Sequence, residues 1–354
     1  MDKFEFRKNN FNIIRFLAAL QVVIVHGYHH FGIEYGKSFI MILSVFPGVP
    51  IFFVTSGFLI SASLERSTSL SSYFQNRFLR IYPALWVCFI ISVATIFIFS
   101  SPSFTMKEFG LWALAQLTIG QFYNPDFLRD YGVGVLNGSL WTIPIEIQFY
   151  IFLPLLYMFF NKIKWNSIIL FIMMIFFIGI SRYYINGYAG SENILIKIIG
   201  VSLPLYLYMF LFGVFLQRKL EFIEKYLANK FIYWLSIYLA FVLASYSLGF
   251  IYGGNDINPL LALLLALLTM SAAYSKTSVF SVFLKEYDIS YGIYIYHMVF
   301  VNILLQIAIF SPSINMLIMF IATILTAVLS WKIIEKPSLS LKKYSINRRK
   351  ASIN

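Results

Sequence analysis

The hydrophobic positions of this chain fall into long runs, and short polar segments separate most of them. Each run holds about twenty residues with few charges, the length of α-helix that crosses the ~30 Å hydrocarbon core of a bilayer. We therefore predict an all-α integral membrane protein with about ten transmembrane helices. The predicted spans are residues 11–31, 38–62, 82–101, 141–161, 165–183, 196–217, 230–250, 257–275, 289–310 and 313–334.

The composition supports the same fold class. Hydrophobic residues make up 60% of the 354 residues, charged residues make up only 12%, and the mean hydropathy is +0.78. A soluble domain needs a solvated surface and carries about 25% charged residues. The composition therefore excludes a soluble globular protein.

The net charge of +12 raises the question of a nucleic-acid partner. If the N-terminus is cytoplasmic, 21 Lys and Arg residues fall in cytoplasmic segments, five fall in outer segments, and Arg15 lies within the first span. Cytoplasmic loops of membrane proteins collect Lys and Arg in this way. The charge pattern thus predicts cytoplasmic N- and C-termini and no nucleic-acid partner.

The chain reads as one membrane domain over residues 1–340, followed by a basic cytoplasmic tail over residues 341–354. Basic residues precede the first apolar run as in a signal peptide, but His26 interrupts the run and no small-x-small cleavage site follows it. We therefore predict that the first span is retained. Cys88 is the single cysteine, which argues against a disulfide framework and a cysteine metal cluster.

One connection is long and polar. Residues 101–140 carry several Pro, Gly and Asp residues and cannot face lipid. We expect this segment at the outer surface or folded back over a cavity.

Two ionisable residues lie inside the first predicted span. Arg15 and His26 are eleven residues apart, about three helical turns, so both project from one helix face with roughly 16 Å between them. An ionisable residue within a membrane predicts a functional site, and a histidine there can act as general base or nucleophile. The alternative is a packing residue that a neighbouring helix satisfies. His29 and His30 follow, but no cysteine lies near them, and we predict no metal site.

Glu146 lies about one and a half turns inside the fourth predicted span, at a depth similar to that of His26. A buried carboxylate is costly unless it has a partner. If the partner is a histidine, the carboxylate would orient its ring so that it can act as a base. A structural ion pair with Arg15 or another helix is the alternative.

Arg77 and Arg80 lie at the predicted cytoplasmic boundary with i,i+3 spacing, which puts both guanidinium groups on one helix face. Arginine binds phosphate through paired hydrogen bonds and stays charged, so the pair suits a phosphorylated ligand. The alternative is an anchor to lipid headgroups.

The ninth predicted span carries a stripe of Ser290, Tyr294 and His297. These hydroxyl and imidazole groups are candidates for lining a polar tunnel. The alternative is hydrogen bonding between helices.

Six segments occur in order along the chain: Arg15 with His26, residues 50–60, residues 77–83, residues 140–150, residues 290–297 and residues 335–337. Together they resemble the acyltransferase 3 family, integral-membrane enzymes that O-acylate surface polysaccharides, peptidoglycan, membrane glucans and some small molecules. The resemblance covers nearly the whole chain. The fourth segment departs from the usual Trp-Ser-Leu-x-x-Glu-x-x-Phe-Tyr at Thr142 and Pro144.

The resemblance implies an acyltransferase that moves an acyl group, most often acetyl in this family, from cytoplasmic acyl-CoA to a hydroxyl of a surface or lipid-linked glycan such as O-antigen or exopolysaccharide. Acetyl-CoA would be a co-substrate and not a resident cofactor. The implied roles are catalysis for His26 with Glu146, and acyl-CoA binding for Arg15, Arg77 and Arg80. The family's relatives imply a bacterial inner membrane. Three aromatic residues of the long outer segment would stack on sugar rings: Trp112, Tyr123 and Tyr131.

Other functions remain open at this point. The buried ionisable residues would also suit a proton-coupled glycan or metabolite transporter, although we find none of the internal symmetry that many transporters show. An acyltransferase with a small-molecule acceptor and an assembly partner in glycan export are further alternatives. The sequence does not indicate an oligomeric state.

Overall fold

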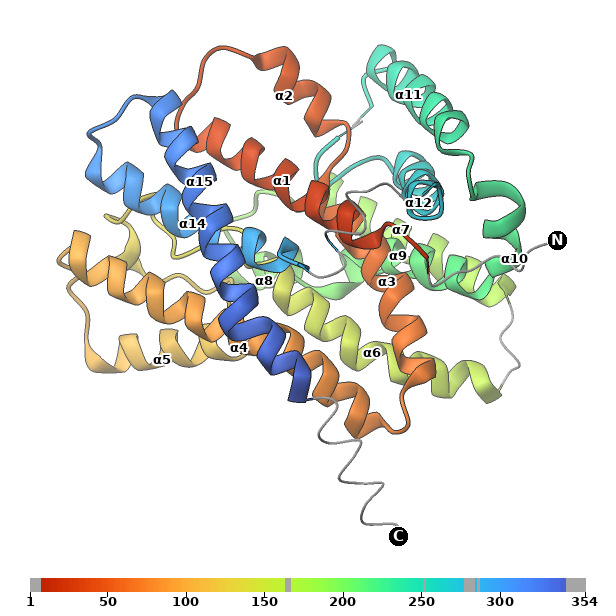
Figure 1. Cartoon of the computed structure of the whole chain (residues 1–354), viewed down its shortest axis with the longest axis horizontal. Helices are drawn as coiled ribbons and strands as arrows, with labels where there is room; N and C mark the ends of the chain where they lie inside the picture. Colours follow the sequence, from red (N-terminus) through yellow and green to blue (C-terminus); the bar gives the residue numbers. More distant parts are fainter. Residues whose placement is uncertain (1–7, 163–166, 251–252, 277–283, 285–286, 342–354) are drawn as a thin grey trace, which may run out of the picture. The chain divides into compact units, whose positions relative to one another are not determined.

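A computed structural model describes residues 8–162, 167–250, 253–276, 284 and 287–341 (Figure 1). All regular elements within these residues are helices, which confirms the predicted all-α fold. The predicted tail beyond Leu341 lies outside the described residues. The chain forms two compact units: unit 1 contains Met1–Val25, Gly36–Arg66 and Ile145–Glu286, and unit 2 contains His26–Tyr35, Ser67–Pro144 and Tyr287–Asn354.

Apolar helices cover all ten predicted spans, and two of these spans, residues 38–62 and 196–217, are each divided between two helices. Within the described ranges, eight helical stretches are long and apolar enough to cross a membrane, and a bent pair makes up to nine. The eighth predicted span, residues 257–275, corresponds to α12 (Pro259–Ala273), whose 15 residues extend about 22 Å and fall short of the ~30 Å hydrocarbon core. The protein is a multi-pass integral membrane protein.

Unit 1 is organised around two helices whose backbones touch. A Cβ atom on Gly57 of α3 would lie 2.0 Å from the carbonyl oxygen of Phe210 in α9, and one on Gly213 would lie 2.1 Å from that of Val54. Glycine at such a crossing allows close van der Waals packing, a main source of helix association in a bilayer. The longer helices of this unit are most of α1 (Phe11–His30), α2 (Lys37–Ser44), α3 (Gly48–Arg66), most of α6 (Thr142–Lys162), α7 (Ser167–Gly187), α8 (Ile194–Gly200), α9 (Leu203–Arg218), α11 (Phe231–Ser247) and α12.

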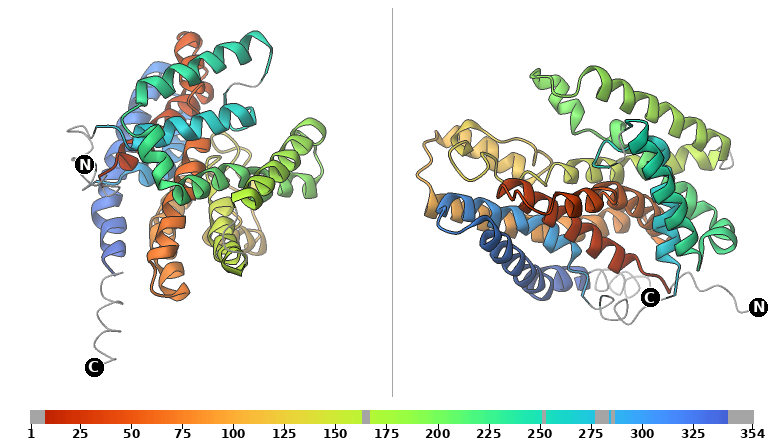
Figure 2. Two further views of the ribbon diagram at one scale, coloured as in Figure 1. Left: turned by 90° about the vertical axis from the view of Figure 1, so that its right-hand side faces the viewer. Right: turned by 90° about the horizontal axis from the view of Figure 1, so that it is seen from above.

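A sharp bend precedes α11. The short helix α10 (Leu220–Phe222) continues into a π-helical turn, η2 (Ile223–Leu227), and this segment meets α11 at 86°. Ile223 and Leu227 are buried and hold the turn in place. Beyond the bend, α11 and α12 pack side by side (Figure 2).

Unit 2 is built on α4, which packs on α14, and α14 packs on α15 (Figure 2). Its helices are the last turn of α1, α4 (Leu70–Phe99), α5 (Met106–Leu117), η1 (Asp126–Leu128), α14 (Ser290–Ile307), α15 (Pro312–Ser330) and η3 (Trp331–Glu335).

The helix α4 begins twelve residues before the span that hydropathy predicts. The Ser69 hydroxyl accepts a hydrogen bond from the Ser72 amide at 3.1 Å and caps the helix there. Pro83, the second residue of the predicted span, therefore lies inside the helix. Hydropathy marks where a helix becomes apolar, whereas a cap marks where it begins, so Arg77 and Arg80 lie on the same continuous helix as the span.

The long segment 101–140 folds back along unit 2. The helix α5 packs on α4, where the Trp86 indole donates to the Leu117 carbonyl at 3.0 Å and the Phe89 and Trp112 rings lie 5.2 Å apart. Trp112 and Tyr131 are each 1% exposed within an apolar cluster, so the predicted stacking of these two rings on sugars is wrong. Tyr123 is 41% exposed and remains accessible.

The irregular end of this segment is bound to α14 by side-chain hydrogen bonds. Asn302 donates to the carbonyls of Val135 and Leu136 at 3.0 and 2.9 Å, and its side-chain oxygen accepts from the Val133 amide at 3.0 Å. Farther along, the Asn137 amide group donates to the Ile295 carbonyl at 2.7 Å. Because α14 satisfies these backbone groups, a non-helical segment can lie buried among membrane helices.

Candidate functional site

His26 and His297 form a hydrogen-bonded pair in unit 2. His26 Nδ1 lies 3.0 Å from His297 Nε2, and the ring centroids are 5.2 Å apart. His297 is completely buried, whereas His26 is partly exposed and so accessible to a reactant. Arg15 and His26 lie on the same uninterrupted helix, α1, as the sequence predicts.

The acceptors around His297 determine which nitrogen atoms carry protons. His297 Nδ1 lies 2.8 Å from the Tyr294 carbonyl, and a carbonyl only accepts hydrogen bonds, so Nδ1 carries the proton. In the neutral ring, His297 Nε2 is then an acceptor, and His26 Nδ1 donates to it. A neutral His26 therefore keeps an unprotonated Nε2, the form that a general base requires.

The sequence did not identify His297 as the partner of His26. The two residues are 271 positions apart, and no local pattern records such a pairing. The available signal was that both histidines interrupt apolar spans, where a polar group needs a partner.

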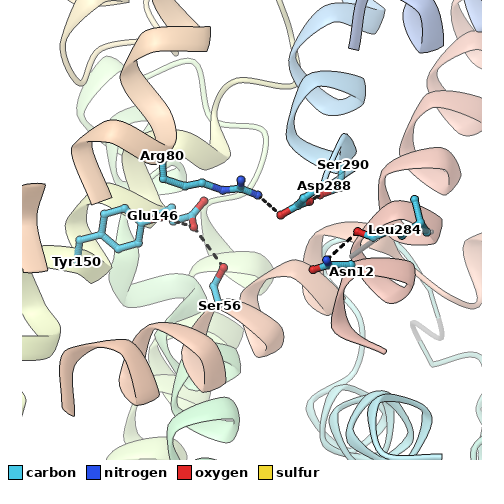
Figure 3. Close-up of polar contacts among 8 residues, drawn as sticks. All are labelled: Asn12, Ser56, Arg80, Glu146, Tyr150, Leu284, Asp288 and Ser290. Atoms are coloured by element: carbon cyan, nitrogen blue, oxygen red, sulfur yellow. Dashed lines mark hydrogen bonds and ion pairs between the residues drawn. The ribbon is translucent and has the colours of Figure 1, made fainter. Parts of the chain in front are cut away.

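Glu146 of α6 accepts hydrogen bonds from two side chains of unit 1 (Figure 3). Its Oε1 accepts from the Tyr150 hydroxyl at 2.6 Å and from the Ser56 hydroxyl at 3.3 Å. Tyr150 follows Glu146 by one helical turn, and Ser56 comes from α3. These two donors fix the carboxylate between α3 and α6. Pro144 is one of the two positions that depart from the family's usual motif. It falls in the first turn of α6, where a backbone N–H would have no partner within the helix, so proline costs no hydrogen bond there.

Arg80 forms an ion pair that the sequence analysis did not predict. Its Nη2 lies 2.5 Å from Oδ2 of Asp288, and the two side chains are only 15% and 14% exposed (Figure 3). The Ser290 hydroxyl donates to Oδ1 of the same carboxylate at 2.8 Å. Arg77 is partly exposed one turn before Arg80 on α4.

The proposed tunnel-lining residues Ser290, Tyr294 and His297 are all buried. The Tyr294 hydroxyl donates to the Ser139 carbonyl at 2.6 Å and lies 2.8 Å from the Thr142 hydroxyl. These hydrogen bonds join α14 to the segment that leads into α6, within unit 2. Among the described residues, no group of three or more His, Cys, Asp or Glu side chains is arranged to hold a metal ion.

A family model described as an acyltransferase domain, that of acyltransferase 3, matches residues 8–335. The chain is 28% identical over 358 residues to nodulation protein 10 of Rhizobium leguminosarum bv. viciae, with 97% of this chain and 96% of the relative covered. It is 26% identical over 356 residues to an O-acetyl transferase of Shigella phage Sf6, with 94% and 97% covered. A shorter match, 29% identical over 156 residues, covers 41% of this chain and 24% of a peptidoglycan O-acetyltransferase of Listeria monocytogenes. No solved structure matches the chain.

Proposed function

Because the chain belongs to the acyltransferase 3 family of membrane-bound O-acyltransferases, we propose that it transfers an acetyl group from cytoplasmic acetyl-CoA to a hydroxyl of a surface or lipid-linked glycan. The observation that carries the proposal is the His26–His297 hydrogen bond, which leaves Nε2 unprotonated on the partly exposed side chain of His26. Two relatives are named as O-acetyltransferases, which supports acetyl as the acyl group and oxygen as its acceptor.

The proposed reaction uses His26 as a general base. Its Nε2 takes the proton of the acceptor hydroxyl while that oxygen attacks the thioester carbonyl carbon. The tetrahedral intermediate then expels the CoA sulfur, and the protonated Nε2 returns its proton to that sulfur. His297 holds the ring of His26 in the required tautomer and orientation, a role that carboxylates fill in other histidine-dependent enzymes.

Arg77 and Arg80 would bind the phosphates of the donor. Both lie on one face of α4, and Arg80 is held by Asp288 at a site with little solvent. Arg15 would contact the pantetheine arm farther into the bilayer. Arg15 and His26 are separated by roughly 16 Å along α1, a length of the same order as that arm.

Glu146 is the second proposed catalytic residue. Its carboxylate is held by Tyr150 and Ser56, so it is oriented before any substrate arrives. A fixed negative charge would stabilise the positive charge that develops on His26 during the reaction. The orientation of His26 itself falls to His297 in this mechanism.

The glycan would approach from the outer side of a bacterial inner membrane, and acetyl-CoA from the cytoplasm. The predicted topology, with both termini in the cytoplasm, places the basic pair on the donor side. The exposed Tyr123 offers a ring for stacking on a sugar.

The proposal is tested by NMR of the surface glycan from cells that carry the wild type, the His26→Ala variant or an empty vector, with membrane levels matched. An O-acetyl signal with the wild type alone would support both the reaction and the base, and its position would identify the acceptor hydroxyl. Identical spectra from all three strains would remove the glycan acceptor, and acetyl-CoA-dependent acetylation of small molecules or substrate transport would then be examined.

A further inference from the structure

The ion pair between Arg80 and Asp288 has no assigned role. Arg80 Nη2 and Asp288 Oδ2 are 2.5 Å apart, and both side chains are largely buried (Figure 3). An ion pair in such a position is more strongly coupled than one at the protein surface. Arg80 is also one of the two arginines that, in the proposed function, bind the phosphates of the donor.

Asp288 is fixed by contacts that do not involve Arg80. The Ser290 hydroxyl donates to its second oxygen, Oδ1, at 2.8 Å. The residue also lies two positions before the start of α14, where the helix dipole favours a negative charge. The Asp288 carboxylate therefore keeps its position and its charge even when Arg80 binds another anion in its place.

We propose that Asp288 is an internal counter-ion that competes with a donor phosphate for Arg80 and so weakens the binding of acyl-CoA and of the product CoA. The inference rests on the proposed function, because it takes Arg80 as a phosphate ligand. In the empty site, Asp288 stabilises the buried guanidinium. When CoA binds, its phosphate takes the place of the carboxylate, or shares the guanidinium with it against the repulsion of like charges.

The consequence follows from linkage between the two interactions. Without the Asp288 charge, the empty state loses the free energy of the ion pair, whereas the CoA-bound state loses nothing or gains from reduced repulsion. Binding of a phosphate-bearing ligand must then become tighter. For an enzyme that must release CoA in each turnover, the aspartate keeps the product from being retained.

The test is direct binding of CoA to the purified full-length protein in nanodiscs, for the wild type, Asp288→Asn, Arg80→Ala and Asp126→Asn. The Asp126→Asn variant is the matched control, because it removes one negative charge from a fully exposed side chain of the same unit. S-acetylpantetheine, which has no phosphate, serves as the control ligand.

We expect Asp288→Asn to lower the Kd of CoA by about five- to tenfold, the effect of one partly buried charge pair. The Kd of S-acetylpantetheine should not change, and Asp126→Asn should match the wild type for both ligands. In steady-state assays, Asp288→Asn should lower the KM for acetyl-CoA and lower kcat as CoA release slows.

Two results would overturn the inference, and they are distinguishable. If Arg80→Ala weakens CoA binding while Asp288→Asn leaves it unchanged or weaker, Asp288 does not compete and the proposed donor site stands. If Arg80→Ala leaves CoA binding unchanged, the donor site itself is wrong. Should Asp288→Asn fail to fold, Ser290→Ala provides the test: it removes the hydrogen bond that stabilises the displaced carboxylate, so CoA should bind about twofold more weakly with S-acetylpantetheine unaffected, and unchanged or tighter binding of CoA would contradict the inference.

Discussion

His26 Nδ1 donates a hydrogen bond across 3.0 Å to His297 Nε2, and His297 in turn donates from Nδ1 to the backbone carbonyl of Tyr294. The chain of donors fixes the tautomers of both neutral rings and leaves one unprotonated nitrogen, Nε2 of His26. Since His297 is fully buried, its effect on a substrate must pass through His26.

Replacing Glu146 with Gln should lower kcat by about a hundredfold or more while leaving the KM for acetyl-CoA near its wild-type value. The variant keeps the shape and the hydrogen bonds from Tyr150 and Ser56 but removes the charge proposed to act on the transition state. Tyr150→Phe should have a smaller effect, about tenfold or less, because Glu146 keeps its charge and the Ser56 bond. A fully active Glu146→Gln enzyme would exclude the carboxylate from the mechanism.

Replacing Asn302 with Ala should loosen the irregular segment that connects α5 to α6. The side chain makes three hydrogen bonds to backbone groups of Val133, Val135 and Leu136, and each lost bond to a buried group costs about 1–3 kcal/mol. Trypsin should then cut more rapidly after Arg129, whose side chain is 54% exposed.

Asn315→Ala is the control for that experiment. Asn315 is also buried in unit 2, but the hydrogen bond that its side chain donates to the Phe310 carbonyl is long at 3.4 Å. The wild type and Asn315→Ala should be cut at similar rates. Equal cleavage of Asn302→Ala and the wild type would show that Asn302 does not hold the segment.

Replacing Gly57 with Leu should prevent or severely weaken folding. The new side chain would begin 2.0 Å from the Phe210 carbonyl oxygen, so α3 and α9 would have to separate, which costs at least about 1–3 kcal/mol. Gly179→Leu is the matched control, because a Cβ atom there meets no atom within 4 Å. The midpoint of thermal unfolding in detergent should fall for the first variant only, and equal midpoints would contradict the close packing.

Single introduced cysteines should report the predicted topology without further mutation. The native Cys88 is 1% exposed and donates its thiol hydrogen to the Ile295 carbonyl, so it should not react. A membrane-impermeant maleimide should label Asp126→Cys in intact cells and Lys225→Cys only after the membrane is opened. Both sites are exposed, and the opposite labelling pattern would reverse the assigned orientation.

Most of the fold could be predicted from the sequence because long apolar runs have few alternatives in a membrane. What hydropathy does not report is irregular structure held by long-range hydrogen bonds. The segment before α6 is polar, which predicts an outer loop, yet Asn302 and Asn137 bind it to α14. Likewise, α12 is apolar enough for a span but too short, since its helix begins only at Pro259, after the cap formed by Asn258.

The candidate site was predicted in part. His26 and Glu146 stood out because a charged or titratable side chain in an apolar span is costly, and Arg80 stood out because its spacing from Arg77 suits a phosphorylated ligand. Their partners did not stand out. Asp288 lies in a polar stretch, where a carboxylate is ordinary, and His297 lies in a stripe of tyrosines that suits packing equally well. A pairing between residues more than 200 positions apart is visible only once the chain is folded.

The role of His26 as a base oriented by His297 can be measured through the rate of acetyl transfer in membrane vesicles for His26→Ala, His297→Ala and the double variant. The exposed neighbour His29→Ala serves as control and should match the wild type. We predict no transfer by His26→Ala above vesicles lacking the protein, and a kcat about a hundredfold lower for His297→Ala with little change in the KM for acetyl-CoA. The double variant should be no worse than His26→Ala, because His297 acts through His26. Wild-type transfer by His297→Ala, or measurable transfer by His26→Ala, would contradict the account.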